Sequence, residues 1–552
     1  MASDSARPLK LSMRFLSFLL VILLTIACVV LGAVVSSYFY WGLALLGPLS
    51  LLGVYDLVQT RHSITRNYPI AAHFRFLLEG IRPEIHQYFI ESDIDGRPYN
   101  RDQRSLIYER AKNIEGLKPF GTELDVYGDE YEWLSHSMAP RPKSAEPFRT
   151  TVGGPDCKQP YSCSLLNISA MSFGAISPNA IMALNSGAKK GGFYHCTGEG
   201  GLSPYHLKPG GDLVWQIGTG YFGCRKDDGT FDPELFREQA VHDAVKMIEI
   251  KISQGAKPGH GGVLPAAKIT PELAATRKIS MGHDCVSPPG HSAFQTPRGL
   301  CEYIAQLRDL SGGKPVGFKL CVGHPVELLA ICKAMLDTDI LPDFITVDGG
   351  EGGTGAAPME FSDSVGAPLK GGSTFVHHAL VATNLRDKIK IAASGKVSSA
   401  FTIARNLAIG ADWCNAARGF MMAVGCIQAQ ACHTNRCPVG VATQDKLRQR
   451  ALDVGDKGER TFHFHRLTME TLSEVTAAAG LDHANQFRPC HVWLRVNRTR
   501  ALPYDEAFEF EQPGALLAGT ARHQQLQRFW EVVSPDSFVP KAYEGEGASD
   551  EH

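Results

Sequence analysis

Apolar runs that each end in a glycine-rich tail recur from about residue 160 onward, and they constrain the fold of this chain most strongly. These runs are predicted to be buried strands: SLLNISAM, FYHCTG, MIEIKIS, VGFKLCVG, FITVDGG, KIKIAASG and DWCNAARG. Helical stretches such as 325–336 and 400–411 lie between several of them. Strand, glycine-rich loop and helix in repetition are typical of parallel βα units with right-handed crossovers. Over roughly 280 residues the pattern favours an α/β fold of the (β/α)8 TIM-barrel type over an open sheet, because the tails all follow strands. The less periodic stretches 200–245 and 260–300 are predicted to be insertions at the same face.

Two apolar runs near the N-terminus predict a transmembrane helical hairpin. Residues 15–35 carry no charge and residues 38–56 are almost wholly apolar. Each run approaches the ~20 residues that a helix needs to cross ~30 Å of hydrocarbon. The alternative for the first run is a signal peptide, but its apolar region is longer than the usual ~7–15 residues and no A-x-A-like site is obvious.

The basic residues around this hairpin predict its orientation. They lie outside the pair and not in the turn between the runs: Arg7, Lys10, Arg14, Arg61 and Arg66. By the positive-inside rule both ends are cytoplasmic, which predicts a multi-pass protein of the inner (cytoplasmic) membrane whose downstream part faces the cytoplasm. Gly47-Pro48 interrupts the second run. If that run lies in the membrane interface instead, the downstream part would be on the other side.

Four segments are expected along the chain. They are a membrane anchor (1–60), a connecting subdomain (61–149), the barrel (150–445) and a C-terminal helical extension with a disordered tail (446–552). The formal net charge of −2 indicates no nucleic-acid partner. The fourteen cysteines are scattered over a long chain, which fits reduced thiols or a metal centre in the cytosol better than a disulfide scaffold.

The glycine-rich tails GAIS, TGEGG, QGAKPGHGG, DGGEGGTGA and SGKVSS bring backbone N–H groups close to a ligand, and a phosphate is the commonest ligand of such loops. In DGGEGGTGA, residues 348–356, an aromatic ring and a ribityl chain could lie against the backbone because side-chain bulk is small. For any one loop, a set of tight turns is the favoured interpretation, but five such loops at strand ends favour a ligand site. No Rossmann fingerprint is present.

Three cysteines lie within twelve residues of GCIQAQACHTNRCPVGVATQ. Cys426, Cys432 and Cys437 have the spacing C-x5-C-x4-C, and three thiolates in one turn-rich stretch can converge on an iron centre. Zinc with His433 as a fourth ligand is the rival, although the spacing fits neither C-x2-C nor H-x3-H sites. The third interpretation is three small buried hydrophobic residues. The neighbouring asparagine, arginine and proline make it less favoured.

Six motifs together resemble the FMN-binding domain of glutamate synthase. They occur in the order ISAMSFGAIS, TGEGG, IKISQGAKPGHGG, SPPGH, DGGEGGTGA and ACHTNRCPVGVATQ. The resemblance covers roughly residues 150–445, while the hairpin and residues 60–145 fit a stand-alone, membrane-anchored glutamate-synthase-like family. It implies two cofactors, FMN and a [3Fe–4S] cluster, the latter held by Cys426, Cys432 and Cys437.

The resemblance also implies roles for single residues. Glu199 corresponds to an acidic residue near the reacting centre, and Lys257 to a lysine that meets 2-oxoglutarate. Lys319 would lie near flavin N1, where a positive charge stabilises the anionic reduced ring. The residues that would line the flavin are Met171, Ser172, Gly174, Asp348, Gly349, Gly350, Gly353 and Thr354. Those that would hold its phosphate are Gly395, Lys396, Arg418 and Gly419.

Two positions depart from the family pattern GAKPGEGGQLP. His260 stands in place of the acidic residue and Val263 in place of the glutamine, and valine cannot donate a hydrogen bond to a dicarboxylate. The chain also lacks the N-terminal cysteine of a glutamine amidotransferase, so glutamine hydrolysis is not expected on it. The substrate is therefore open.

Three functions are weighed. The leading one is reductive amination of a 2-oxo acid with ammonia to glutamate, with electrons from a ferredoxin-like or membrane donor. The second keeps both cofactors but acts on another amino acid or joins an amine to glutamate, which His260 and Val263 favour. The third is a non-catalytic electron-transfer or scaffold subunit in the lipid bilayer. Retention of Glu199, Lys257 and Lys319 argues against the third.

Overall fold

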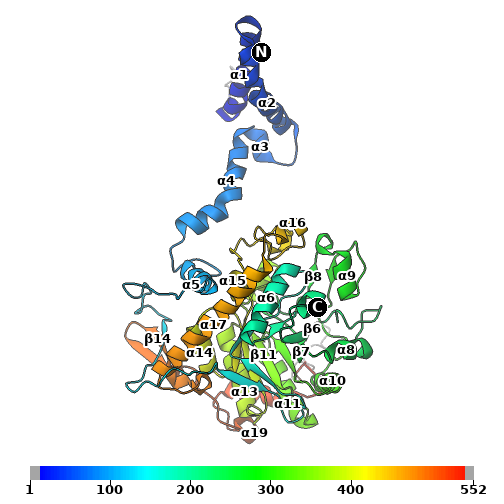
Figure 1. Ribbon diagram of the computed structural model, residues 1–552, viewed down its shortest axis with the longest axis vertical. Coiled ribbons are helices and arrows are strands. Elements are labelled where there is room, and N and C mark those ends of the chain that lie inside the picture. The colour runs from blue at the N-terminus through cyan, green and yellow to red at the C-terminus, as the bar shows by residue number, and fades with distance from the viewer. Residues whose placement is uncertain (1–12, 541–552) are drawn as a thin grey trace, which may run out of the picture. The chain divides into compact units, whose positions relative to one another are not determined.

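The structure is a computed structural model that describes residues 13–540. Arg7, Lys10 and the tail 545–552, which is predicted to be disordered, lie outside the described residues. Internal contacts divide the chain after Arg101 into two compact units (Figure 1). The domain boundaries after residues 60, 149 and 445 remain predictions.

The first unit is helical. Its elements are η1 (Met13–Phe15), α1 (Leu16–Val34), η2 (Ser37–Gly42), α2 (Leu43–Val58), α3 (Ser63–Asn67), α4 (Ala71–Ile85) and the π-helix η3 (His86–Ile90). Two segments are long and apolar enough to be candidate membrane spans: Leu16–Val34 with a mean hydropathy of 2.9 and Ser37–Val58 with 1.5. Only 6% and 11% of these spans are buried, so they differ from the core helices of a soluble protein.

Polar side chains connect the helices of this unit. Thr25 Oγ1 of α1 lies 2.9 Å from Ser50 Oγ of α2. Asp56, buried near the end of α2, accepts a hydrogen bond of 2.9 Å from Ile70 N and lies 2.9 Å from His73 Nε2. The start of α4 is thereby held to the end of the second candidate span.

The second unit contains the predicted (β/α)8 barrel. Eight strands form a closed sheet in the order β4-β5-β6-β7-β10-β11-β12-β13, and every neighbouring pair is parallel. Their bounds are β4 (Leu166–Ile168), β5 (His195–Cys196), β6 (Leu213–Ile217), β7 (Val245–Lys251), β10 (Val316–Leu320), β11 (Phe344–Asp348), β12 (Lys390–Ser394) and β13 (Trp413–Ala416). The barrel interpretation of the sequence is confirmed.

One barrel strand was not predicted. Strand β6 lies inside 200–245, which the sequence pattern assigned wholly to an insertion, and all five of its residues are buried. Both of its faces are covered: Trp215 stacks on Phe236, while Gln216 donates to Glu249 inside the barrel. A polar residue that faces the barrel interior interrupts the apolar run, and the usual strand signal is lost.

Helices surround the strands (Figure 1). They are α6 (Pro178–Gly191), α7 (Pro204–Leu207), α8 (Pro233–Ala240), α10 (Pro297–Leu310), α11 (Pro325–Thr338), α13 (Leu369–Ala382), α14 (Ala400–Ala408) and α15 (Arg418–Ala423). Several begin with a capping side chain followed by proline, as in Ser177-Pro178 and Thr296-Pro297. The cap accepts an otherwise unpaired N–H, and proline suits the first helical position. The long β7–β10 connection also holds β8 (Val263–Leu264), η4 (Ala266–Lys268), α9 (Pro271–Arg277) and β9 (Cys285–Val286).

The segment after the barrel is helical at first and then mixed. Helix α17 (Val454–Ala478) packs along α6, and α16 (Lys446–Gln449) precedes it. The predicted helical extension also contains β14 (Val492–Asn497) and β15 (Arg500–Pro503), which form an antiparallel sheet with β1 (Glu132–Leu134). The remaining elements are α5 (Arg101–Ala111), β2 (Arg149–Val152), β3 (Tyr161–Ser164), α12 (Met359–Ser364), η5 (Cys432–Thr434), η6 (Ala484–Gln486), η7 (Pro489–His491), α18 (Tyr504–Ala507), α19 (Ala515–Ala518) and α20 (Gln524–Val532).

Candidate active site and cysteine centre

The strand order of the barrel brings the predicted site residues to one end. The candidate flavin residues follow β4, β11, β12 and β13, which are consecutive around the barrel, and Lys319 lies on the adjacent β10. Glu199 follows β5, and Lys257 follows β7, on the other side of the ring. Since all strands run the same way, these tails share the carboxyl end, where barrels place their active sites.

A buried ion pair marks the boundary between these two groups. Lys319 Nζ lies 3.1 Å from Asp348 Oδ2, and the same oxygen accepts a hydrogen bond of 2.8 Å from Gly255 N. Burial lowers the pKa of Lys319, but Asp348 and Glu249 outweigh it and leave the pKa above its ordinary value. Lys319 is therefore a fixed positive charge, as a lysine beside a reduced flavin ring would need to be.

The glycine-rich tails pack backbone against backbone. A Cβ added at Gly255 would overlap the carbonyl oxygen of Gly349, and one added at Gly198 would lie 2.6 Å from Ser172 N. Gly198 and Gly174 also have positive φ, of 68° and 100°, which favours glycine. The tails of β4 and β5 thus pack backbone against backbone, as do those of β7 and β11, and neither contact leaves room for a side chain at these glycines.

The predicted phosphate residues follow β12 and β13. Arg418 Nη2 donates a hydrogen bond of 2.7 Å to Glu351 O, and a Cβ on Gly353 would lie 2.7 Å from Arg418 Nε. Lys396 has a φ of 45°, and the preceding residue Gly395 a φ of 151°. The arginine is positioned by the β11 tail, and this contact brings a guanidinium to the strand end where barrels hold a phosphate.

Glu199 lies among positive charges. Lys251 Nζ, at the end of β7, lies 2.8 Å from Glu199 Oε1, and both side chains are largely buried. Arg277 is buried as well, donates 2.8 Å to Phe173 O and interacts electrostatically with Glu199. Lys251 lies in the IKISQGAKPG motif, but the sequence interpretation assigned it no role.

Burial and charge oppose each other in this group. Burial raises the pKa of Glu199, while Lys251, Lys257 and Arg277 outweigh it, so the pKa lies below its ordinary value. Burial lowers the pKa of Lys257, which Glu199 only partly restores. The carboxyl group is therefore ionised at neutral pH, and Lys257 releases its proton more easily than an exposed lysine does.

A narrow pocket joins these residues. Glu199, Thr219, Lys251, Lys257 and His260 line it, together with residues 252–254, 259, 261–262 and 288–289. His260 is exposed, and its Nδ1 lies 2.7 Å from Gly261 O. Val263 is also exposed and is not part of the pocket lining. Of the two departures from the family pattern, only His260 reaches the pocket.

Glu249 is a further buried residue that the sequence interpretation missed. Gln216 Nε2 and Thr346 Oγ1 each donate a hydrogen bond of 2.6 Å to its two carboxylate oxygens. It lies inside the barrel and interacts electrostatically with Lys319. Glu249 is one of the charged residues that alternate with apolar ones in MIEIKIS. Such alternation places every second residue of a strand on the inner face of the barrel, which explains the buried position of Glu249.

The three cysteines lie in a strained stretch after α15. Gln428, Gln430 and Asn435 have positive φ values of 59°, 53° and 61°, so the segment folds back on itself repeatedly. Burial, together with the nearby Cys432 and Cys437, raises the pKa of Cys426 to about 11. The three thiols are close enough to interact.

The thiol spacing bears on which metal centre they fit. No group of three ligands that includes these cysteines has its ligand atoms all within 4.8 Å, across residues 13–540. A single zinc ion with Zn–S bonds of about 2.3 Å draws its sulfur ligands to about 4 Å from one another. Three soft thiolate donors are also the ligand type of iron–sulfur clusters, so the residues present fit such a group.

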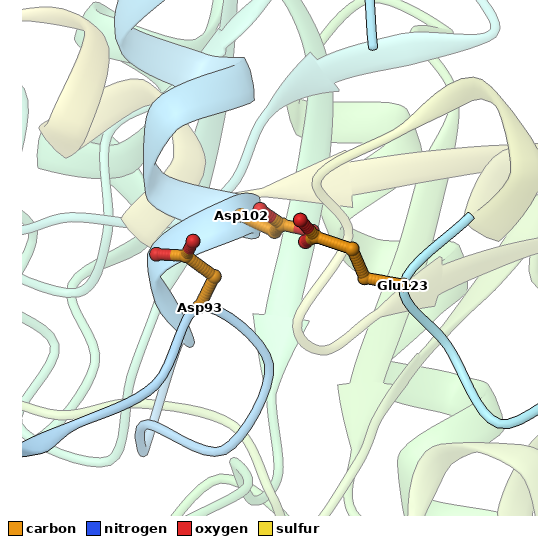
Figure 2. Close-up of side chains that lie close together, drawn as sticks. All are labelled: Asp93, Asp102 and Glu123. Atoms are coloured by element: carbon orange, nitrogen blue, oxygen red, sulfur yellow. The ribbon is translucent and has the colours of Figure 1, made fainter. Parts of the chain in front are cut away.

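An acidic pair elsewhere in the second unit shares one lysine. Asp102 and Glu123 point toward each other (Figure 2). Lys118 Nζ donates hydrogen bonds of 2.7 and 2.8 Å to the two carboxylates. The pair forms an exposed ion-pair network of the ordinary surface kind.

Comparisons with known proteins identify relatives of this chain. The conserved region of glutamate synthase matches residues 156–482. The glutamate synthase large subunit-like protein YerD of Bacillus subtilis is 37% identical over 481 residues, 80% of this chain and 91% of that protein. The archaeal glutamate synthase (NADPH) of Methanocaldococcus jannaschii is 34% identical over 323 residues, 58% of this chain and 60% of that protein.

Similarity to solved structures is weaker. A mandelate oxidase variant matches 75% of this chain and 98% of that chain, with a TM-score of 0.41 and 12% identity. Membership in a family therefore rests on the sequence relatives and on the matched conserved region. The chain belongs to the glutamate synthase family and is a glutamate-synthase-like oxidoreductase.

Proposed function

We propose that the protein is an FMN- and [3Fe–4S]-dependent enzyme that makes glutamate, or a related amino acid, from a 2-oxo acid and ammonia. Bound FMN supplies the hydride that reduces the imine of the oxo acid. The chain provides the charges that bind the acid, the group that handles protons and the cysteines through which electrons arrive. The names of its relatives, glutamate synthases among them, support this reaction class.

The observation that carries the proposal is the charge group at the carboxyl ends of β5 and β7. Lys251, Lys257 and Arg277 place three cationic groups around the single carboxylate of Glu199, so the group has a net positive charge when all four are ionised. A dianionic 2-oxo acid would compensate that charge. Lys257 would bind a substrate carboxylate, since it lines the pocket together with Glu199.

Glu199 would handle the protons of amination. It is ionised at neutral pH, so it can accept a proton from the protonated nitrogen of the carbinolamine that precedes the imine. Lys251, only 2.8 Å away, would hold the carboxylate toward the pocket and stabilise its charge. Removal of Lys251 would then alter the pH dependence of the reaction.

The cofactor residues remain those proposed from the sequence. Met171, Ser172, Gly174 and the residues of the β11 tail would line the flavin, Lys319 would face its pyrimidine edge, and Arg418 with Lys396 would hold its phosphate. Cys426, Cys432 and Cys437 would hold the cluster, which would receive single electrons from a ferredoxin-like or membrane donor.

A related substrate is the second candidate. His260 lines the pocket with an exposed imidazole where the family pattern has an acidic residue, so this position no longer repels an anionic group. An oxo acid with a further anionic group, or an amine in place of ammonia, fits this change. The chemistry of the carbonyl carbon would be unchanged.

Membrane attachment is part of the proposal. The two candidate spans would form a hairpin with Arg14, Arg61 and Arg66 on the cytoplasmic side. The barrel would then work in the cytoplasm, where 2-oxo acids and reduced donors are available.

The reaction is tested by isotope transfer. Anaerobic protein reduced with dithionite and given 2-oxoglutarate with 15N-ammonium is expected to form labelled glutamate in proportion to its flavin. The Glu199→Gln variant should form little, because the carboxylate that takes up protons is lost. A screen of other 2-oxo acids and amines separates the two candidates, and flavin-loaded protein that converts none of them contradicts both.

A further inference from the structure

Lys268 is a buried lysine beside the cysteine segment. It is the last residue of η4 in the β7–β10 connection and is only 4% exposed. Its Nζ donates a hydrogen bond of 2.9 Å to Cys432 O. The two chain segments that meet here are 164 positions apart in the sequence. No motif of the sequence analysis included this residue.

The ammonium group of Lys268 has no carboxylate partner. Among residues 13–540 no ion pair involves it, and its side-chain hydrogen bond goes to the backbone carbonyl of Cys432. Burying an unpaired ammonium is costly, because the protein interior replaces its hydration poorly. Neutral thiols would not compensate that charge, whereas thiolates bound to a metal cluster would.

We propose that Lys268 is a positioning and charge-compensating residue of the cysteine centre. Its hydrogen bond fixes the backbone of Cys432, and its positive charge stabilises the centre more strongly once one electron has been added and the centre is more negative. The step is a transfer of one electron from the donor to the centre, with no proton or bond change. This inference rests on the proposed function, since it requires that the cysteines hold an iron–sulfur cluster.

The same residue links the cluster to the substrate pocket. The connection that carries Lys268 begins with the pocket residues Lys257 and His260 and continues into α9. In α9, Leu273 packs so tightly on Gly174 that a Cβ there would overlap it, and Arg277 approaches Glu199. Lys268 therefore attaches the pocket-forming loop to the cysteine segment at one defined point.

Two substitutions separate charge from packing. Lys268→Met keeps the length of the side chain and removes the charge, while Lys268→Arg keeps the charge. Lys278→Met removes a lysine of the same connection whose side chain is exposed, and serves as the control. All three are made in the full-length protein, purified without oxygen.

The measurement is a redox titration of the cluster followed by electron paramagnetic resonance, with iron, sulfide and FMN content determined in parallel. Lys268→Met is expected to shift the cluster midpoint potential to more negative values and to slow its reduction by a one-electron donor. Lys268→Arg should restore both, and Lys278→Met should match the wild type. FMN content should equal that of the wild type in every variant.

Each other outcome has a defined meaning. A cluster-containing Lys268→Met protein with the wild-type potential overturns the inference and leaves the proposed function intact. Loss of the cluster in Lys268→Met with retention in Lys268→Arg supports it, and loss in both overturns the role of the charge. Wild-type protein without iron and sulfide overturns the cluster assignment, and the inference with it.

Discussion

At the scale of single residues, the site depends on charges that are buried in combination. Glu199 has a lowered pKa only because Lys251, Lys257 and Arg277 surround it, since burial alone would raise that pKa. The sequence motifs identified Glu199 and Lys257 as candidates. They could not identify Lys251 and Arg277 as their partners, because those contacts depend on how the β7 tail and α9 fold back over the barrel end.

The pH dependence of activity should depend on Lys251. Glu199 is ionised above its lowered pKa, so the acid limb of the kcat/KM profile should lie below the range of an ordinary glutamate. Lys251→Met should raise the pKa of Glu199, because burial then acts against fewer positive charges, and the limb should move to higher pH. Lys246→Met, on the same strand but partly exposed, should leave the limb in place. An unchanged limb in Lys251→Met would show that Glu199 is not the titrating group.

Backbone packing at the strand ends predicts a contrast between two glycines. Gly255→Ala should abolish FMN retention and destabilise the fold by roughly 1–3 kcal/mol, the usual range for overpacking, because the added Cβ overlaps the backbone of Gly349. Gly355→Ala should be nearly neutral, since a Cβ there meets nothing within 4 Å. Flavin content and urea denaturation measure both effects. Equal flavin content in the two variants would contradict the tight-packing account.

At the scale of elements, strands made of continuous apolar runs were predictable from the sequence, while the strand interrupted by a polar residue was not. Runs such as FITVDGG and KIKIAASG became β11 and β12, because their residues are buried on both faces. Strand β6 was missed, since Gln216 points to the barrel interior and finds its partner in Glu249, a residue of another strand. In a single sequence, a polar strand residue whose hydrogen-bond partner lies far away in the chain cannot be told from a loop residue.

The two apolar N-terminal elements predict how the protein fractionates. The full chain should sediment with membranes and resist extraction by alkaline carbonate, because the spans Leu16–Val34 and Ser37–Val58 are mostly exposed in the protein alone. A chain without residues 1–60 should be released to the soluble fraction and keep its flavin. A full-length protein that is extracted by carbonate would contradict membrane insertion, and a C-terminal tag cleaved only from the outer side would contradict the orientation.

At the scale of the whole molecule, the residues proposed for the flavin site and for the cluster lie at separate places. The proposed flavin and substrate residues lie at the strand ends, while the cysteines follow α15, beyond the last strand. The order of the motifs predicted both parts from the sequence. Their connection through Lys268 was not predictable, because it joins a loop and a turn that are far apart in the chain.

This separation predicts the behaviour of cysteine variants. Cys426→Ser, Cys432→Ser and Cys437→Ser should each lose iron and sulfide, since an alkoxide is a poor ligand for iron in such a centre. Cys490→Ser, at an exposed cysteine outside the segment, should keep them. FMN should remain in all four proteins. Zinc in anaerobically prepared wild-type protein, or loss of flavin together with iron, would contradict the assignment.

The central claim is that a flavin-loaded barrel transfers electrons to the imine of a 2-oxo acid. A single-turnover stopped-flow experiment tests it most directly: anaerobic, fully reduced wild-type protein is mixed with 2-oxo acid and ammonium while flavin absorbance is followed. Rapid reoxidation is expected only when both compounds are present, and Glu199→Gln should slow it by about two to four orders of magnitude, the range typical of a lost general acid or base. Flavin that stays reduced with every 2-oxo acid and amine tested would contradict the account.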